Sequence, residues 1–142
     1  MPRKKIVVSI LICTLLTLSV IPVYGAVGNG GNASVCAMYY RSANATLIIS
    51  TDGRATATGS ITGLAGTTTK TTVHLYLQQY KSGKWENVDD WLDSGATVNR
   101  TLSKTKTVEK GYKYRTKASC YAYSGTKCEH VTKYSKAVSY GI

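Results

Sequence analysis

Residues 111–123, GYKYRTKASCYAY, alternate strictly between two kinds of side chain, and this pattern constrains the fold more than any other in the chain. Successive side chains of a β-strand point to opposite faces of its sheet. The strand therefore has one uncharged face suited to a core, formed by Tyr112, Tyr114, Thr116, Ala118, Cys120 and Ala122. A Ser-Gly step and a second run of β-forming residues follow, so the pattern predicts an antiparallel hairpin.

Other alternating runs, separated by turn-forming residues, predict further strands. Asp-Gly at 52–53 indicates a hairpin between strands over 45–50 and 55–63. The second of these has small inward residues, and we expect the tyrosines of the 111–123 strand to cover them. A strand over 71–80 turns at Ser-Gly into the next one, and a register with Tyr80 opposite Trp85 sets Leu77 opposite Val88. Strands over 98–108 and 131–140 complete the pattern, and the last one needs a bulge to reconcile its phase.

About seven short strands with a turn signal every 8–12 residues predict an all-β fold, an antiparallel β-sandwich of the immunoglobulin-like kind. A tyrosine near the start of a late strand is typical of such domains, because its hydroxyl bonds back to the corner that precedes the strand. Tyr112 or Tyr114 would fill that position. A single sheet closed on itself is the alternative architecture.

The first 25 residues have the pattern of a secretory signal peptide. Arg3, Lys4 and Lys5 precede an uncharged apolar run over 6–20, and small residues precede a cleavage point ahead of Ala26. We therefore expect a signal peptide over 1–25, a flexible leader over 26–44 and a β-sandwich domain over 45–142. The mature protein would be secreted or cell-wall associated, with no stable membrane insertion after cleavage.

Three cysteines would remain after cleavage, namely Cys36, Cys120 and Cys128, and export implies an oxidising compartment. If Ala122 pairs with Thr126 across a three-residue loop, Cys120 faces Cys128 directly. We therefore predict a Cys120–Cys128 disulfide. Pairing of Cys36 with either of the other two cysteines, or no bridge at all, are the alternatives.

The string TTVHLYLQQYKSGKWENVDDW, followed by RTLSKTKTVEKGYKYRTKASCYAYSG, resembles a family of small secreted proteins of Gram-positive bacteria whose function is uncharacterised. The resemblance covers about 47–139. It rests on an LYLQ-type strand, a Gly-Lys-Trp hairpin and a Lys-Gly-Tyr-x-Tyr-Arg strand. It implies a signal peptide and an exported immunoglobulin- or fibronectin-like β domain, and it supplies no catalytic residues.

The sequence argues against an enzyme, because no GxSxG or HExxH motif occurs and the two histidines belong to separate predicted strands. No catalytic residues, cofactor or metal site are expected. The spacing of Cys120, Cys128 and His130 matches no familiar zinc site. The acidic run over 86–93 lies on a strand, which spreads its carboxylates over two faces.

Binding is the function that the charge distribution favours. The whole chain has a formal net charge of +11, and ten basic residues but only two acidic ones lie between Arg100 and Lys136. We predict an anionic-polymer-binding surface formed by Lys104, Lys106, Lys113, Arg115 and Lys117. Its partners would be teichoic acid, acidic polysaccharide or membrane lipid, and the export signal argues against nucleic acid. The alternative is that these charges serve solubility and protect sheet edges.

A second candidate surface is an aromatic platform that stacks on sugars or contacts a protein. The predicted register places it on one face, with His74, Tyr76, Tyr80, Trp85 and Trp91. The alternative is that these rings are covered, since a chain with no Phe needs aromatic side chains for its core. The expected function is thus a secreted, non-catalytic binding module. A structural or protein-interaction component of envelope or spore, and a cationic toxin or bacteriocin, are the alternatives.

Overall fold

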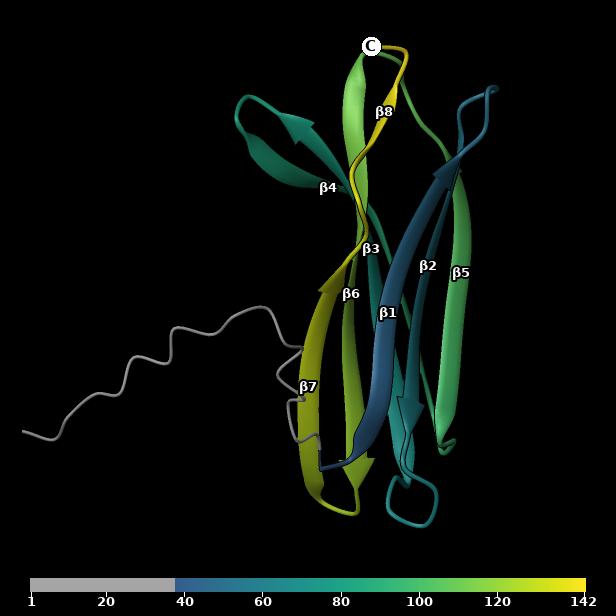
Figure 1. Ribbon diagram of the computed structural model, residues 1–142, viewed down its shortest axis with the longest axis vertical. Helices are drawn as coiled ribbons and strands as arrows, with labels where there is room; N and C mark the ends of the chain where they lie inside the picture. Colours follow the sequence, from purple (N-terminus) through teal and green to yellow (C-terminus); the bar gives the residue numbers. More distant parts are fainter. Residues whose placement is uncertain (1–37) are drawn as a thin grey trace, which may run out of the picture. The chain divides into compact units, whose positions relative to one another are not determined.

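The computed structural model describes residues 38–142, which form two antiparallel sheets (Figure 1). The expected signal peptide, Cys36 and most of the expected leader lie outside the described residues. One sheet has the strand order β1-β2-β5 and the other β4-β3-β6-β7, with β8 also paired to β6. The strands are β1 (Tyr40–Ile49), β2 (Arg54–Gly63), β3 (Lys70–Lys81), β4 (Lys84–Gly95), β5 (Asn99–Thr107), β6 (Tyr112–Ser124), β7 (Lys127–Tyr134) and β8 (Val138–Tyr140).

This arrangement confirms the predicted all-β, immunoglobulin-like sandwich. Hairpins join β1 to β2, β3 to β4, and β6 to β7, while the connections before β3, β5 and β6 pass from one sheet to the other. Two separate sheets pack face to face, so the fold is not a single closed sheet. The first strand begins at Tyr40, five residues before the expected start of the domain.

The core lies between β2, β3 and β6, and the predicted inward faces of these strands are buried. Gly59 marks the closest approach of the two sheets. A Cβ atom at Gly59 would lie 2.9 Å from Ala118 Cβ, 2.9 Å from Leu75 Cδ1 and 3.2 Å from Val73 Cγ1. The expectation that tyrosines cover this small-residue face is therefore wrong at Gly59, where aliphatic side chains fill the space.

Tyr114, the third residue of β6, forms the tyrosine corner. Its side chain is 1% exposed, and its hydroxyl donates a hydrogen bond to the Glu109 carbonyl at 2.8 Å. Gln79 Nε2 donates to the same hydroxyl at 3.3 Å. Of the two tyrosines considered from the sequence, the structure selects Tyr114.

The β3–β4 hairpin confirms one part of the predicted register and corrects another. Tyr80 pairs with Trp85 across a turn in which Ser82 and Gly83 both have positive φ, as a type I′ turn requires. A bulge then follows, so that Leu77 pairs with Asp89 and not with Val88. Because a shift of one residue exchanges the two faces of a strand, every residue of β4 beyond the bulge points to the face opposite to the predicted one.

The β6–β7 turn contradicts the predicted disulfide. Ser124 pairs with Lys127, so the turn has two residues, with Gly125 at its first position and φ 59°. Cys120 therefore pairs with Val131 and points into the core, whereas Cys128 pairs with Tyr123 and is exposed. Both thiols are free, and they lie on opposite faces of the sheet.

The expected bulge in the last strand is confirmed. The segment divides into β7 and β8, which pair with successive parts of β6. Lys117 pairs with Tyr134 in β7, whereas Tyr114 pairs with Val138 in β8, so one extra residue lies between the two ladders. This shift directs Tyr134 outward and allows Val138 and Tyr140 to pack against the core.

Candidate anion-binding face

The outer face of the β4-β3-β6-β7 sheet combines the two surfaces that the sequence suggested separately. Alternation along β3 and β6 directs one set of side chains into the core and the other set outward. We call the charged, aromatic and amide members of the outward set, together with their neighbours on β4 and β7, the aromatic–basic face. It consists of Lys70, His74, Tyr76, Gln78, Tyr80, Trp85, Asp90, Lys113, Arg115, Lys117, Tyr121, Tyr123, His130 and Tyr134.

Arg115 is the central cation of this face. Its guanidinium carbon lies 4.3 Å from the centroid of the Trp85 ring and 4.3 Å from that of the Tyr134 ring. Its Nε donates to Gln78 Oε1 at 2.8 Å. Among residues 38–142, the two terminal Nη groups have no hydrogen-bond partner. The rings and Gln78 thus fix the side chain, while its donor-bearing end remains free to bind an anion.

A second cation lies beside a hydrogen-bonded chain of three side chains. Lys117 Nζ is 5.0 Å from the Tyr76 ring centroid. The Tyr76 hydroxyl and His74 Nδ1 are 2.7 Å apart, and His74 Nε2 lies 2.7 Å from Asp90 Oδ2. With a neutral imidazole, Tyr76 donates to His74 and His74 donates to Asp90. The Asp90 carboxylate is therefore already hydrogen-bonded within the protein.

The surroundings of Tyr76 favour its neutral hydroxyl. Burial raises the pKa of the Tyr76 hydroxyl, and the nearby Asp90 carboxylate and Tyr121 raise it further. The hydrogen bonds from Asp90 through His74 to Tyr76 hold these side chains of the face together.

The remaining rows of the face repeat the pairing of a ring with a polar or charged group. Tyr121 stacks on His130 with their centroids 4.4 Å apart, and Lys70 Nζ lies 5.1 Å from the Tyr123 ring centroid. Tyr80 and Trp85 are in contact at a centroid distance of 5.2 Å. Aromatic rings and cations therefore lie side by side over all four strands β4, β3, β6 and β7.

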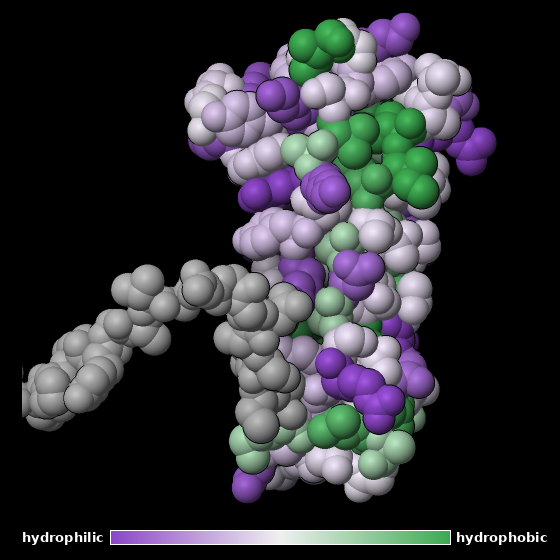
Figure 2. All heavy atoms as spheres, in the orientation of Figure 1, coloured by the Kyte–Doolittle hydropathy of each residue, from purple (hydrophilic) through white to green (hydrophobic). Residues whose placement is uncertain are grey.

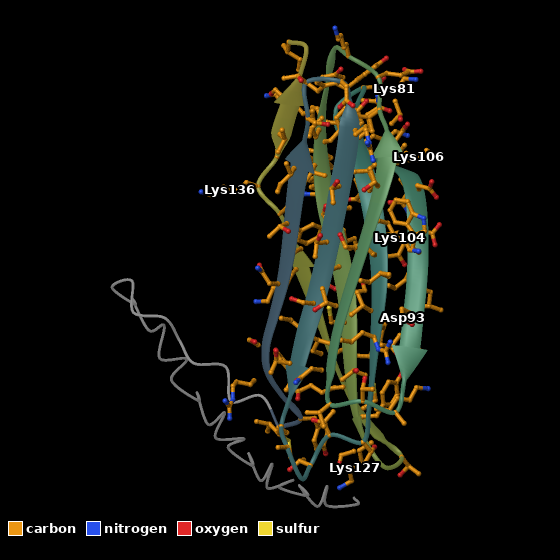
Figure 3. All side chains as sticks on the ribbon, turned by 90° about the vertical axis from the view of Figure 1, so that its right-hand side faces the viewer. Lys81, Asp93, Lys104, Lys106, Lys127 and Lys136 are labelled. Atoms are coloured by element: carbon orange, nitrogen blue, oxygen red, sulfur yellow. The ribbon has the colours of Figure 1, made fainter. Side chains whose placement is uncertain are left out.

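Lys104 and Lys106 do not belong to this face, so the structure does not bring together all five residues of the predicted basic surface. Both lysines are in β5, which is in the other sheet. Figure 3 shows Lys106 and Lys104 above Asp93, along the margin where β5 lies next to β4. Lys106 Nζ bonds to Asp89 Oδ2 at 2.7 Å, and this hydrogen bond lowers the pKa of the Asp89 carboxyl.

A second ion pair at the same margin joins Arg100 of β5 to Asp93 of β4. Asp89 and Asp93 of β4 therefore neutralise cations of β5 and connect the two sheets. The other two acidic residues of β4 pair within their own sheet, Glu86 with Lys84 and Asp90 with His74. Lys104 adds charge at this margin without joining the aromatic–basic face.

Trp91 does not lie with the other residues of the predicted aromatic platform. Beyond the β4 bulge it pairs with Leu75, and its side chain packs against the core cluster. His74, Tyr76, Tyr80 and Trp85 remain on the outer face, as predicted. For Trp91 the alternative interpretation, that the aromatic side chain serves the core, is correct.

Sequence reasoning missed several members of the face, chiefly Tyr134, Tyr121, His130 and Gln78. Tyr121 follows from the alternation in 111–123 and could have been found there. Tyr134 and His130 could not be assigned to a face, because the bulge before β8 conceals the phase of the last strand. Gln78 has a role only through its contact with Arg115.

A cleft of about 250 Å³ opens between the sheets near the tyrosine corner. It is lined by Gln79, Val88, Lys106, Thr107, Val108, Glu109 and Tyr114. The Lys106 ammonium is paired with Asp89, and the Tyr114 hydroxyl already has two partners. These two polar groups of the cleft are therefore engaged in holding the sandwich together.

Another exposed surface lies away from the aromatic–basic face. Figure 2 shows apolar surface over the end of β1 that is nearest to β8. Ile48 of β1 is 69% exposed, whereas Ile49 and Val138 are partly buried against the core. Single exposed aliphatic side chains are common on soluble domains, so this surface defines no function by itself.

Comparison with protein-family models, with curated proteins and with solved structures gives no match. Within residues 38–142, no three His, Cys, Asp or Glu side chains gather where a metal ion could bind. The described part of the chain contains no helix able to span a membrane.

Proposed function

We propose that this protein is an exported, non-catalytic module that binds an anionic polymer of the cell envelope through its aromatic–basic face. The observation that carries the proposal is the position of Arg115 between Trp85 and Tyr134, with both Nη groups unpaired within the described chain. Export is supported by the pattern of residues 1–25, and by the resemblance to small secreted proteins of Gram-positive bacteria.

The charge balance of the face supports a polyanion as the ligand. Lys113, Arg115 and Lys117 lie on the same side of β6, with alternate residues of a strand about 6.8 Å apart. Asp90, the carboxylate on this face, is bonded to His74. A chain of phosphates or carboxylates can therefore contact several cations without meeting a free carboxylate of the face.

Arg115 supplies the geometric part of recognition. Contact with two rings and with Gln78 already orders the Arg115 side chain in the unbound protein. Binding therefore costs less conformational entropy than it does for a mobile arginine. A guanidinium fork binds phosphate or carboxylate through two parallel hydrogen bonds, each strengthened by charge. Lys113 and Lys117 contribute attraction that needs no such geometry.

The test is retention of the protein on purified Gram-positive cell walls, with and without their teichoic acid, over a series of NaCl concentrations. We expect retention to need the polymer and to fall steeply with salt, because exposed charges are screened. Arg115→Gln should weaken binding roughly tenfold or more, since a charge-assisted hydrogen bond contributes about 1.5–3 kcal/mol. Arg115→Lys should recover only part of the loss.

The matched control is Lys104→Gln, which removes one positive charge from the other sheet. If binding depended only on net charge, this variant would lose as much affinity as Lys113→Gln. Equal losses in those two variants, or no retention by the wild type at low salt, would refute the proposal.

A protein partner is the second candidate, because large side chains remain exposed on the same face. Tyr80 is 42% exposed, Tyr134 51% and Leu92, at the β4 end of this sheet, 64%. Binding of this kind would persist in salt and would be lost in Tyr134→Ala or Trp85→Ala. Salt-resistant retention that Arg115→Gln leaves unchanged would favour it over the polymer.

A further inference from the structure

The strand β1 forms one edge of its sheet, and this edge is the least protected one of the described domain. From Ser42 to Ile49 the strand has no charged residue, no proline and no bulge. The other edges carry features that discourage strand pairing, namely lysines on β5 and β7, and a bulge and carboxylates on β4. Figure 1 shows β1 in front, with no described strand passing before it. Such an edge is a place where another strand can be added.

The main-chain groups of alternate β1 residues point to this free edge. Ser50 N–H donates to the Arg54 carbonyl at 3.1 Å, in register with the β1–β2 ladder. Residues bonded to the neighbouring strand alternate with residues whose N–H and C=O point away from it. The outward residues, which we call the edge residues, are therefore Ala43, Ala45, Leu47 and Ile49. The Ala45 N–H accordingly bonds to the Asn44 side chain at 2.9 Å, and within residues 38–142 the outward groups of the other three have no hydrogen-bond partner.

We propose that the β1 edges of two copies of this protein pair antiparallel, which joins their β1-β2-β5 sheets into one continuous sheet about a two-fold axis. The pairing that uses every edge residue sets Ala43 opposite Ile49 and Ala45 opposite Leu47 of the second copy. Each of these contacts joins a small side chain to a large one on the inner face. On the outer face, Thr46 lies opposite Thr46 of the second copy, and Thr–Thr is a favourable cross-strand pair.

The charges around this edge favour a second copy as the occupant. The whole chain has a formal net charge of +11, so two copies repel each other wherever their basic surfaces meet. The uncharged stretch of β1 avoids this repulsion, and it lies between charges of opposite sign, Arg41 before it and Asp52 in the turn after it. Within the described residues neither of these side chains forms an ion pair. The antiparallel pairing brings Arg41 of each copy to the turn that contains Asp52 of the other.

The same pairing covers apolar surface at this edge. Ile48 is 69% exposed, and it lies opposite Asn44 of the second copy. Figure 2, which has the orientation of Figure 1, shows apolar surface at that end of β1. Pairing therefore removes from water a side chain that the single copy leaves exposed.

The dimer places the two aromatic–basic faces on one side. The two-fold axis is perpendicular to the shared sheet, because directly opposed residues of neighbouring strands point to the same face. The β4-β3-β6-β7 sheets of both copies therefore cover the same face of the shared sheet, and their outer faces point in one direction. One polymer can then contact both faces, which strengthens its binding without any new contact. This consequence rests on the proposed function, whereas the dimer itself does not.

Sedimentation velocity of the protein purified from producing cells, up to millimolar concentration, tests the dimer. We expect a shift from monomer to dimer as the concentration rises. Thr46→Lys sets like charges opposite each other at the two-fold axis and should raise the dissociation constant of the dimer about fivefold. Thr101→Lys is the matched control, because it adds the same charge to the outer face of the same sheet, on the opposite edge strand β5. It should leave the dissociation constant unchanged.

Cysteine substitutions test the register of the pairing. In a background with Cys36→Ser and Cys128→Ser, Thr46→Cys creates an opposed, non-hydrogen-bonded pair, whose Cα separation of about 4.5 Å allows a disulfide. We expect this variant to form a covalent dimer on a non-reducing gel after mild oxidation. Asn44→Cys is the control, because the register separates its two copies by about 13 Å along the strands. It should stay monomeric on the same gel.

Three outcomes would overturn the proposal. They are a wild type that stays monomeric at every concentration, equal weakening of the dimer by Thr46→Lys and Thr101→Lys, and cross-linking of Asn44→Cys as fast as that of Thr46→Cys. A monomeric wild type would leave the edge to a segment of another protein. A protein that dimerises but is not retained on cell walls would contradict the proposed function alone.

Discussion

Removal of the Tyr114 hydroxyl should destabilise the sandwich more than any other single-oxygen deletion among its tyrosines. Tyr114→Phe deletes the donor to the Glu109 carbonyl at 2.8 Å and the acceptor for Gln79 Nε2 at 3.3 Å. The ring is 1% exposed and stays buried in the variant, so apolar burial is preserved. The loss is therefore confined to two hydrogen bonds.

The magnitude follows from what happens to the two former partners. A net hydrogen bond contributes about 0.5–1.5 kcal/mol, and an unsatisfied buried group costs about 1–3 kcal/mol. Gln79 lines the cleft near the corner, so water can satisfy its amide. We expect a total loss of about 1–2 kcal/mol, which corresponds to a fall in Tm of roughly 5–12 °C for a domain of this size.

Urea unfolding followed by circular dichroism measures this loss, and Tyr112→Phe is the matched control. Tyr112 lies on the same face of β6 two residues earlier, and within residues 38–142 its hydroxyl has no hydrogen-bond partner. It should lose no more than about 0.5 kcal/mol, because the ring of this partly buried residue is kept and no hydrogen bond is removed. Equal losses in the two variants, or an unchanged midpoint for Tyr114→Phe, would refute the assignment of the corner.

Two further predictions test the register of β4 and the burial of the core thiol. Trp91→Ala should lower the free energy of unfolding by about 2–3 kcal/mol, and Trp85→Ala by about 1 kcal/mol or less. The reason is that Trp91 packs on the core, whereas Trp85 mainly contacts Arg115 and Tyr80. A larger loss for Trp85→Ala than for Trp91→Ala in urea unfolding would contradict the bulge. Because burial raises the pKa of the Cys120 thiol to about 11 from its ordinary 9.0, the stability it contributes is fully present below pH 9 and is lost as the pH rises toward 11. Between pH 9 and 11 we expect the unfolding free energy to fall by about 2 kcal/mol more in the wild type than in Cys120→Ala, and parallel curves for the two proteins would count against this explanation.

Local patterns were enough to predict the inward faces of β2, β3 and β6. Apolar or small residues at every second position are removed from water only when that face of the strand is buried, wherever the strand lies in the sheet. The same is true of the turns at Gly53 and Gly83, where positive φ demands a particular residue type. These features depend on the chain within a few residues of each position.

The candidate site was predicted in parts and then assembled differently. Lys113, Arg115 and Lys117 share a face because they alternate along one strand, and sequence alone shows this. That Lys104 and Lys106 lie in the other sheet depends on which strands pair, and alternation carries no information on pairing partners. The contact of Arg115 with Trp85 and Tyr134 joins three strands, so no single segment predicts it.

The two errors of orientation have one physical cause. A bulge in β4 and a turn one residue shorter than expected after β6 each change the register by an odd number of residues. Since side chains alternate with a period of two, such a change moves Trp91 into the core and Cys128 away from Cys120. The sequence by itself determined that these strands form and which faces of β2, β3 and β6 are apolar. Only the tertiary structure decided the register and the sheet of each strand, because these depend on packing between residues far apart in the chain.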